Sequence, residues 1–267
     1  MGGGRAAGGI GGVGLIAVLV IGYFLGIDVT PLLEGGSVGT GSTNNSAQIT
    51  QADERAAQFV SVTLADTEEV WADVFAEQVG RAYTPATLVL FKGVTQSPCG
   101  GASGATGPFY CPSDKKAYLD TDFFTTMERR LGAGGDFAAA YVVAHEIAHH
   151  VQNELGILGQ ANRVRQQVSQ AESNAISVRI ELQADCYSGI WARHAQAQFG
   201  SIERGDIAEA MNAARQIGDD TLARNAGRVP SPHTFTHGTS AQRQDWFARG
   251  YRSGALADCD TFGRGAL

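Results

Sequence analysis

The chain has 267 residues, of which 43% are hydrophobic and 18% charged, a mix typical of a globular protein with one large or two small domains. Its 20 basic and 27 acidic residues give a net charge of −7, which argues against a nucleic-acid partner because such a partner requires a basic surface. The four cysteines form no C-x-x-C pair, which argues against a zinc ribbon or a thioredoxin-like redox site.

The N-terminal segment is apolar enough to cross a membrane. Residues 6–27 include no charged side chain, and as a helix they would span about 33 Å, the thickness of the hydrocarbon core. Arg5 precedes the stretch and two acidic residues follow it, which favours an N-terminus inside the cell and the remaining chain outside. A cleaved signal peptide is the main alternative, but no convincing A-x-A cleavage site follows. We therefore predict a leader and single transmembrane helix within 1–33, in the inner (cytoplasmic) membrane.

Residues 34–50 are rich in Gly, Ser, Thr and Asn, which is typical of a flexible linker, and they predict a folded domain over 51–267. Apolar residues at helical spacing predict a first helix over 52–79. The next segments are β-like runs at 86–91 and 110–120. Further helices are expected, with Asp122 and Asp136 capping the first two, over 122–131, 136–156, 161–200, 203–227 and 240–250. This order predicts an α+β domain that is mainly helical with a small sheet.

An even number of cysteines in an exported domain indicates two disulfides, and four cysteines allow three pairings. Cys99 and Cys111 flank a loop rich in glycine and serine, so we favour Cys99–Cys111 together with Cys186–Cys259. Four reduced thiols in a cytosolic core would be the default interpretation without the apolar N-terminal segment.

The sequence HEIAHH at 145–150 is the strongest chemical signal. His145 and His149 are four residues apart, so on a helix their side chains diverge by about 40° and can bind one Zn²⁺ at about 2.0–2.1 Å. Glu146 lies beside them, placed to take a proton from metal-bound water. The alternative is a surface helix that carries two histidines by chance. The apolar neighbours favour a buried helix, in which polar side chains need partners.

A catalytic zinc site needs a third protein ligand and leaves one position for water. His150 points about 100° away from His149, which fits a core or supporting role better than metal binding. Glu181 is the better candidate, and Asp185, one turn later, is placed to accept a hydrogen bond from a ligand histidine. The alternative is that both acids pair with basic residues, such as Arg179 or Arg193.

The combination of H-E-x-x-H with E-x-x-x-D on a later helix is similar to the gluzincin metallopeptidases, and the whole chain resembles a bacterial family of neutral zinc metallopeptidases. Besides the apolar N-terminal segment, the resemblance is carried by GPFYCP at 107–112, YLD at 118–120, AHEIAHHVQ at 144–152, ELQADCYSG at 181–189, IGDD at 217–220 and HGTS at 237–240. One departure is Ala148, where the family usually has glycine, a residue of nearly the same size. The resemblance implies a zincin-like fold and a zinc-dependent peptidase, with His145, His149 and Glu181 as metal ligands.

A peptidase of this kind needs a further donor for the oxyanion that forms on the scissile carbonyl. His237, His233 and Tyr251 are the candidates, and we prefer His237 as a second catalytic residue because the sequence around it matches the family. Asp219 or Asp220 is placed to orient it. A buried histidine that caps a helix is an equal alternative for His237.

Residues 118–120 precede the metal-binding helix and are a candidate edge strand for pairing with an extended peptide. The sequence thus predicts a membrane-anchored zinc peptidase that faces outside the cytoplasm and acts on a peptide or protein substrate. The runner-up is a catalytically inactive, metalloprotease-like scaffold or binding module of the cell envelope. Glu146 argues against it, because a structural zinc needs no general base. An intramembrane protease would need several apolar spans, and the sequence has one.

Overall fold

The structure is a computed structural model, and it describes residues 51–103, 107–132, 134–200, 202–203, 205–263 and 265. The predicted anchor (1–33) and linker (34–50) lie outside these residues. Within the described ranges, no helix is both long and apolar enough to cross a membrane.

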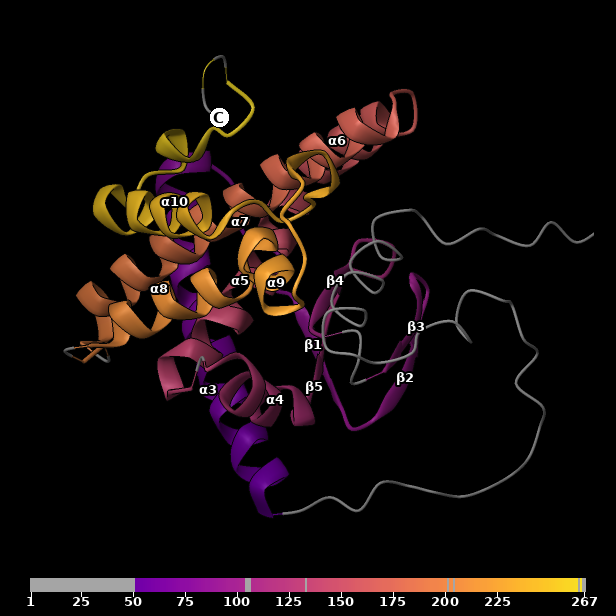
Figure 1. Cartoon of the computed structure of the whole chain (residues 1–267). Helices are drawn as coiled ribbons and strands as arrows, with labels where there is room; N and C mark the ends of the chain where they lie inside the picture. The colour runs from indigo at the N-terminus through magenta and orange to yellow at the C-terminus, as the bar shows by residue number, and fades with distance from the viewer. Residues whose placement is uncertain are drawn as a thin grey trace, which may run out of the picture.

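The described elements begin with helix α3, and the strands follow before most of the helices (Figure 1). In chain order they are α3 (Gln51–Val74), the π-helical turn η1 (Phe75–Val79), β1 (Thr87–Phe91), β2 (Val94–Ser97), β3 (Gly100–Ser103), β4 (Phe109–Cys111), β5 (Lys116–Asp120), α4 (Thr121–Leu131), α5 (Asp136–Glu154), α6 (Ile157–Arg165), α7 (Gln170–Phe199), α8 (Asp206–Gln216), α9 (Asp219–Asn225), η2 (Pro232–Thr234), α10 (Ser240–Ser253) and η3 (Leu256–Cys259).

The helices form the larger part of the domain, with the strands gathered on one side of them (Figure 1). Helix α5 packs against α3, α7 and α8, and α10 packs along α7 and α8. Trp71 of α3 is fully buried and lies edge-on to Phe75 and to Tyr187 of α7, with ring centroids 6.4 and 5.7 Å away. The prediction of a mainly helical α+β domain with a small sheet is confirmed.

The main sheet has the strand order β1-β5-β4, and β2 and β3 form a separate hairpin. Strand β5 runs parallel to β1, where Tyr118 faces Val89, and antiparallel to β4, where the same Tyr118 faces Phe109. Strand β5 is therefore the central strand of this sheet and not the predicted edge strand. The pairing with β4 covers residues 116–118 only, so Leu119 and Asp120 are paired with β1 on one side and not with β4 on the other. Four of the five residues of β5 are buried, which is the pattern of a strand covered on both faces rather than of one with an exposed face.

Two segments predicted as single helices are each divided. Residues 161–200 belong to α6 and α7, because Ser169 and Glu172 form a capping box that starts a new helix. Residues 203–227 belong to α8 and α9, separated at Gly218, where a Cβ atom would lie 2.5 Å from the backbone nitrogen of Ser240. Both interruptions depend on hydrogen-bonding or tertiary contacts, so apolar periodicity alone does not reveal them.

The predicted helix caps are shifted by one or two residues. Asp120, rather than Asp122, caps α4, and its Oδ1 accepts a hydrogen bond of 2.9 Å from the Asp122 backbone nitrogen. Asp136 is the first residue of α5 and Gly135 precedes it without a side-chain cap. An acidic residue in the first turn still interacts favourably with the helix dipole.

Helices α7 and α10 touch at the backbone, and two glycines allow this. A Cβ atom on Gly250 would lie 1.8 Å from the Cys186 carbonyl oxygen, and one on Gly189 would lie 2.1 Å from the Phe247 carbonyl oxygen. Any larger residue would therefore force the helices apart. This close approach brings the buried side chain of Arg243, two turns before Gly250, against α7.

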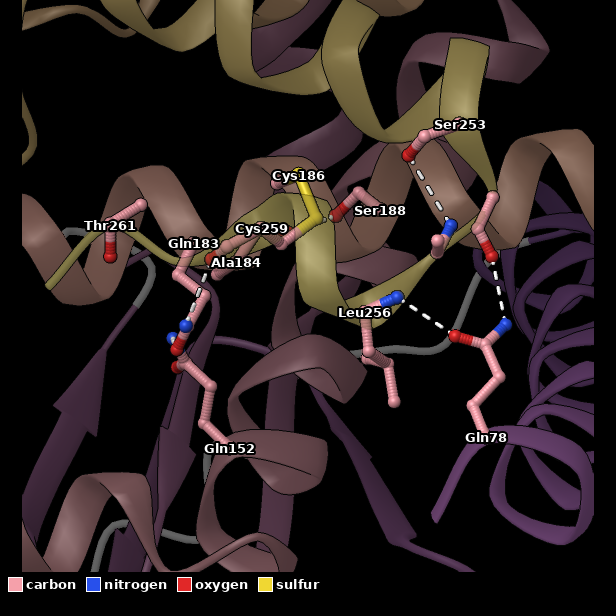
Figure 2. The surroundings of a disulfide bond; sticks show 12 residues. Gln78, Gln152, Gln183, Ala184, Cys186, Ser188, Ser253, Leu256, Cys259 and Thr261 are labelled. Atoms are coloured by element: carbon pink, nitrogen blue, oxygen red, sulfur yellow. Dashed lines mark hydrogen bonds between the residues drawn. A yellow bond between two sulfur atoms is a disulfide. The ribbon is translucent and has the colours of Figure 1, made fainter. Parts of the chain in front are cut away.

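Both favoured disulfides are present, so the predicted pairing is confirmed. Cys99–Cys111 joins the end of the β2–β3 hairpin to β4, and Cys186–Cys259 joins α7 to η3 (Figure 2). The Cα atoms of each pair are 5.7 Å apart, within the normal range for a bridge. The second bridge fixes the end of the chain onto the helix that carries Glu181.

Candidate metal centre

Helix α5 is the central helix of the domain and is buried along most of its length. Its small and apolar residues pack against neighbouring helices, and several of its polar residues are buried with them, namely His145, Glu146, His150 and Gln152. Burial of a polar group without a partner is unfavourable, so each of these side chains requires one. Their partners define the site.

The side chains of His145, His149 and Glu181 meet between α5 and α7, with one ligand atom from each within 4.8 Å of the other two. His145 Nε2 lies 3.1 Å from Glu181 Oε2, and His149 Nε2 lies 3.6 Å from Glu181 Oε1. Two ligand atoms of a tetrahedral zinc site with bonds of about 2.0–2.1 Å are about 3.3–3.4 Å apart. The donor set of two imidazoles and a carboxylate, and its spacing, therefore fit Zn²⁺.

The outer nitrogen of each imidazole faces a buried acceptor. His145 Nδ1 lies 3.0 Å from Asp185 Oδ1. The two atoms are close enough for an ion pair, but they are not aligned for a hydrogen bond. His149 Nδ1 lies 2.9 Å from Gln152 Oε1. Such partners keep the opposite nitrogen of each ring directed at the metal position. The expected contact of Asp185 with a ligand histidine is thus present.

The sequence interpretation missed Arg243, whose guanidinium is buried beneath Asp185. Arg243 Nε donates to Asp185 Oδ2 at 2.8 Å and Nη2 donates to Oδ1 at 2.9 Å, while Tyr141 OH also donates to Oδ1. The alternative partners for the acids, Arg179 and Arg193, bond to backbone carbonyls instead. A signal was present, because Arg243 shares one helical face with Trp246, Phe247 and Gly250, all of which are buried.

Replacing Arg243 by methionine is expected to lower the free energy of unfolding by about 3–5 kcal/mol, because it leaves the Asp185 carboxylate buried without its counter-charge. Arg224→Met is the matched control, since Arg224 forms an exposed i,i+4 pair with Asp220 at 2.7 Å. Its loss is expected to be only about 0.3–0.5 kcal/mol. Denaturant unfolding of both variants measures the difference, and equal losses would contradict the buried-pair argument.

Charge in the site is closely balanced. Burial raises the pKa of Glu146 to about 7, partly offset by His145, so Glu146 is a usable base near neutral pH. Burial opposes protonation of His145, but its contacts with the carboxylates of Asp185 and Glu181 raise its pKa to about 9. Burial also disfavours the Glu181 carboxylate, yet His149 and His145 outweigh it and lower the pKa of Glu181. The two carboxylates of Glu181 and Asp185 thus favour positive charge on the His145 ring that lies between them.

Glu146 is the one acid of this group without a hydrogen-bond donor from the described part of the chain. Only 7% of the residue is exposed, and its carboxylate lies close enough to His145 and Glu181 for their charges to shift its pKa. A carboxylate near a metal site, with no donor in the part of the chain that the structure describes, is available to bind the proton of a water molecule.

The structure brings His237 near this group. It lies close enough for its charge to lower the pKa of both Glu146 and Glu181. Its Nδ1 lies 3.4 Å from Asp219 Oδ1, and Asp219 Oδ2 accepts hydrogen bonds from the backbone nitrogens of residues 236–238. Asp219 therefore orients this loop, whereas Asp220 bonds to Ser240 at the start of α10.

The other two oxyanion candidates lie elsewhere. His233 is exposed in η2. Tyr251 is on α10 beside Gly189, two turns of α7 beyond Glu181.

His150 is a core residue, because its Nε2 donates to the Thr84 carbonyl at 2.7 Å and its Nδ1 faces Tyr110 OH at 3.0 Å. Both its nitrogens are therefore used by the protein.

A helix that carries two imidazoles one turn apart, completed by a carboxylate from a second helix, is the arrangement of a zincin-type metal centre. The chain belongs to the family described as "Putative neutral zinc metallopeptidase", whose family model matches residues 1–262. The predicted family is confirmed.

Relatives of the chain occur in distant bacteria. Uncharacterized protein YpfJ of Escherichia coli (strain K12) is 48% identical over 251 residues, which cover 94% of this chain and 85% of that protein. Uncharacterized protein Rv2575 of Mycobacterium tuberculosis (strain ATCC 25618 / H37Rv) is 47% identical over 190 residues, which cover 67% of this chain and 63% of that protein. No solved structure matches the chain significantly.

Proposed function

We propose that the chain is a zinc-dependent peptidase that hydrolyses peptide bonds, with His145, His149 and Glu181 as metal ligands and Glu146 as general base. The observation that carries this proposal is the nearly buried Glu146 carboxylate, which has no hydrogen-bond donor among the described residues, near a cluster of two imidazoles and a carboxylate. A structural zinc site needs no such base, and it normally has four protein ligands.

Each residue of the site has a separate role in the proposed hydrolysis. Zn²⁺, when bound, supplies a Lewis acid that lowers the pKa of water and polarises the scissile carbonyl. Glu146 accepts the proton of the attacking water, and its raised pKa favours transfer of that proton to the leaving amine. Asp185 and Gln152 hold the two imidazoles in the orientation that binding requires.

His237 is the proposed donor to the oxyanion. Its Nδ1 faces Asp219 and Thr236, so its Nε2 can donate a hydrogen bond only when the ring is protonated. Burial opposes that protonation, but the hydrogen bond to Asp219 raises the pKa of His237. A protonated imidazole close to Glu146 and Glu181 suits the stabilisation of negative charge that develops on a carbonyl oxygen.

The proposed location is the inner membrane, with a single N-terminal span and the catalytic domain outside the cytoplasm. The uncharged residues 6–27 and the two disulfides support this topology, because bridges persist in oxidising compartments. Alkylation of intact cells followed by mass spectrometry tests it. Four free thiols, or a C-terminal reporter fusion active in the cytoplasm, would contradict it.

The deciding experiment uses the purified full chain. Its zinc content is measured by elemental analysis, and cleavage of a broad peptide library is followed with and without a chelator. We expect stoichiometric zinc, cleavage of at least some peptides, loss of cleavage on chelation and recovery on adding zinc. Stoichiometric zinc with no cleavage would favour the inactive scaffold, and absence of zinc binding would refute the metal site.

A further inference from the structure

A continuous chain of buried amides links His149 to the C-terminal end of the domain. His149 Nδ1 lies 2.9 Å from Gln152 Oε1, and Gln152 Nε2 donates to the Ile180 carbonyl at 2.8 Å and to Gln183 Oε1 at 3.0 Å. Gln183 Nε2 then donates to the Cys259 carbonyl at 3.0 Å. Figure 2 shows the two glutamine side chains pointing toward one another beside the Cys186–Cys259 bridge. Gln152 is fully buried and Gln183 is 4% exposed, so water does not replace these bonds.

The direction of every bond in this chain is determined by its ends. The carbonyls of Ile180 and Cys259 can only accept, so each must face an amide nitrogen. Both hydrogens of the Gln152 amide nitrogen are then used, one by Ile180 and one by Gln183. The Gln152 oxygen is left facing the imidazole, and because it can only accept, the proton of His149 must lie on Nδ1. The lone pair of His149 Nε2 is thereby directed at Glu181.

The outer end of the chain is held by contacts along one face of α7. Residues 259–261 lie across Arg179, Gln183 and Cys186, which follow one another at intervals of four and three residues. Thr261 Oγ1 donates to the Arg179 carbonyl at 2.7 Å, and the disulfide fixes Cys259 to Cys186. The Cys259 carbonyl therefore occupies a defined position relative to the helix that also carries Glu181.

We infer that Gln152 and Gln183 are positioning residues that hold His149 as its Nδ1–H tautomer, and that the Cys186–Cys259 bridge anchors this relay. The inference rests on the proposed function, since it assigns His149 Nε2 to the metal. The alternative is that the two glutamines only satisfy buried carbonyls. Gln183 has the smaller role, because Ile180 holds the Gln152 amide independently.

The test compares three Gln→Met variants of the full chain, a substitution that nearly keeps the volume but removes the amide. Gln152→Met is expected to weaken zinc affinity by about 10–100-fold in chelator competition, the usual effect of losing a partner of a ligand histidine. Gln183→Met and Cys186→Ser/Cys259→Ser are expected to weaken it by a smaller factor. Gln78→Met is the matched control, because Gln78 bonds to Gly254 and Leu256 near the same bridge (Figure 2) but has no link to His149. Its zinc affinity is expected to be that of the wild type.

A second measurement does not depend on bound metal. Ring ¹⁵N chemical shifts of histidine in the metal-free wild type report which nitrogen of His149 carries the proton. We expect Nδ1–H in the wild type and in Gln78→Met, and a mixture of tautomers in Gln152→Met. A wild-type His149 that carries its proton on Nε2, or wild-type zinc affinity in Gln152→Met, would overturn the inference. A wild type that binds no zinc would refute the proposed function, while the tautomer would still decide the relay.

Discussion

Replacing Glu146 by glutamine is expected to lower the kcat/KM of peptide hydrolysis by at least about 10²-fold, the low end for loss of a general base. Glutamine has nearly the same shape but cannot accept and return a proton. The metal ligands are unchanged, so zinc content is expected to equal that of the wild type. Steady-state kinetics and elemental analysis on the same preparation measure the two quantities separately.

Glu154→Gln is the matched control for this experiment, because Glu154 lies on the same helix and its side chain is only 8% exposed. Its carboxylate is paired with Lys115 at 3.0 Å, away from the metal cluster. We expect wild-type kcat/KM from this variant. Undiminished activity in Glu146→Gln would show that another group takes the proton, and the role assigned to Glu146 would be wrong.

The parts of the site that the sequence predicts are those that depend on one helix at a time. His145 and His149 share a face because they are four residues apart, and the same rule relates Glu181 to Asp185. Buried polar residues need partners, so the two histidines and the two acids are expected to meet. In the structure they do. Likewise, the spacing of cysteines around a loop favoured a disulfide pairing that is confirmed.

The parts that the sequence does not reveal depend on contacts between distant segments. Arg243 reaches Asp185 across 58 residues, and the position of α10 that allows this depends on the backbone contact at Gly250. Gln183 bonds to Cys259 across 76 residues. Strand β5 lies in the centre of its sheet because of pairing partners on both sides, which its own residues do not specify. Local sequence patterns predict which residues share one face of a helix or strand, but not which other element packs against that face.

Glu181→Ala is expected to nearly abolish zinc retention, because it removes one of three protein ligands and the carboxylate that lies between the two imidazoles. Asp185 is not a ready substitute, since its carboxylate is held by Arg243 and Tyr141. Zinc is expected to raise the Tm of the wild type, as any ligand of the folded state does, but not that of this variant. Elemental analysis after dialysis and thermal unfolding with added zinc measure the two effects.

Glu172→Gln is the control on the same helix, because glutamine retains the capping box with Ser169 while removing the charge. It is expected to keep both the zinc content and the zinc-dependent rise in Tm. Full zinc occupancy in Glu181→Ala would eliminate Glu181 as a ligand and leave His145 and His149 as a pair without their carboxylate. Loss of zinc from Glu181→Ala but not from Glu172→Gln would identify Glu181 as the ligand that α7 contributes to the cluster.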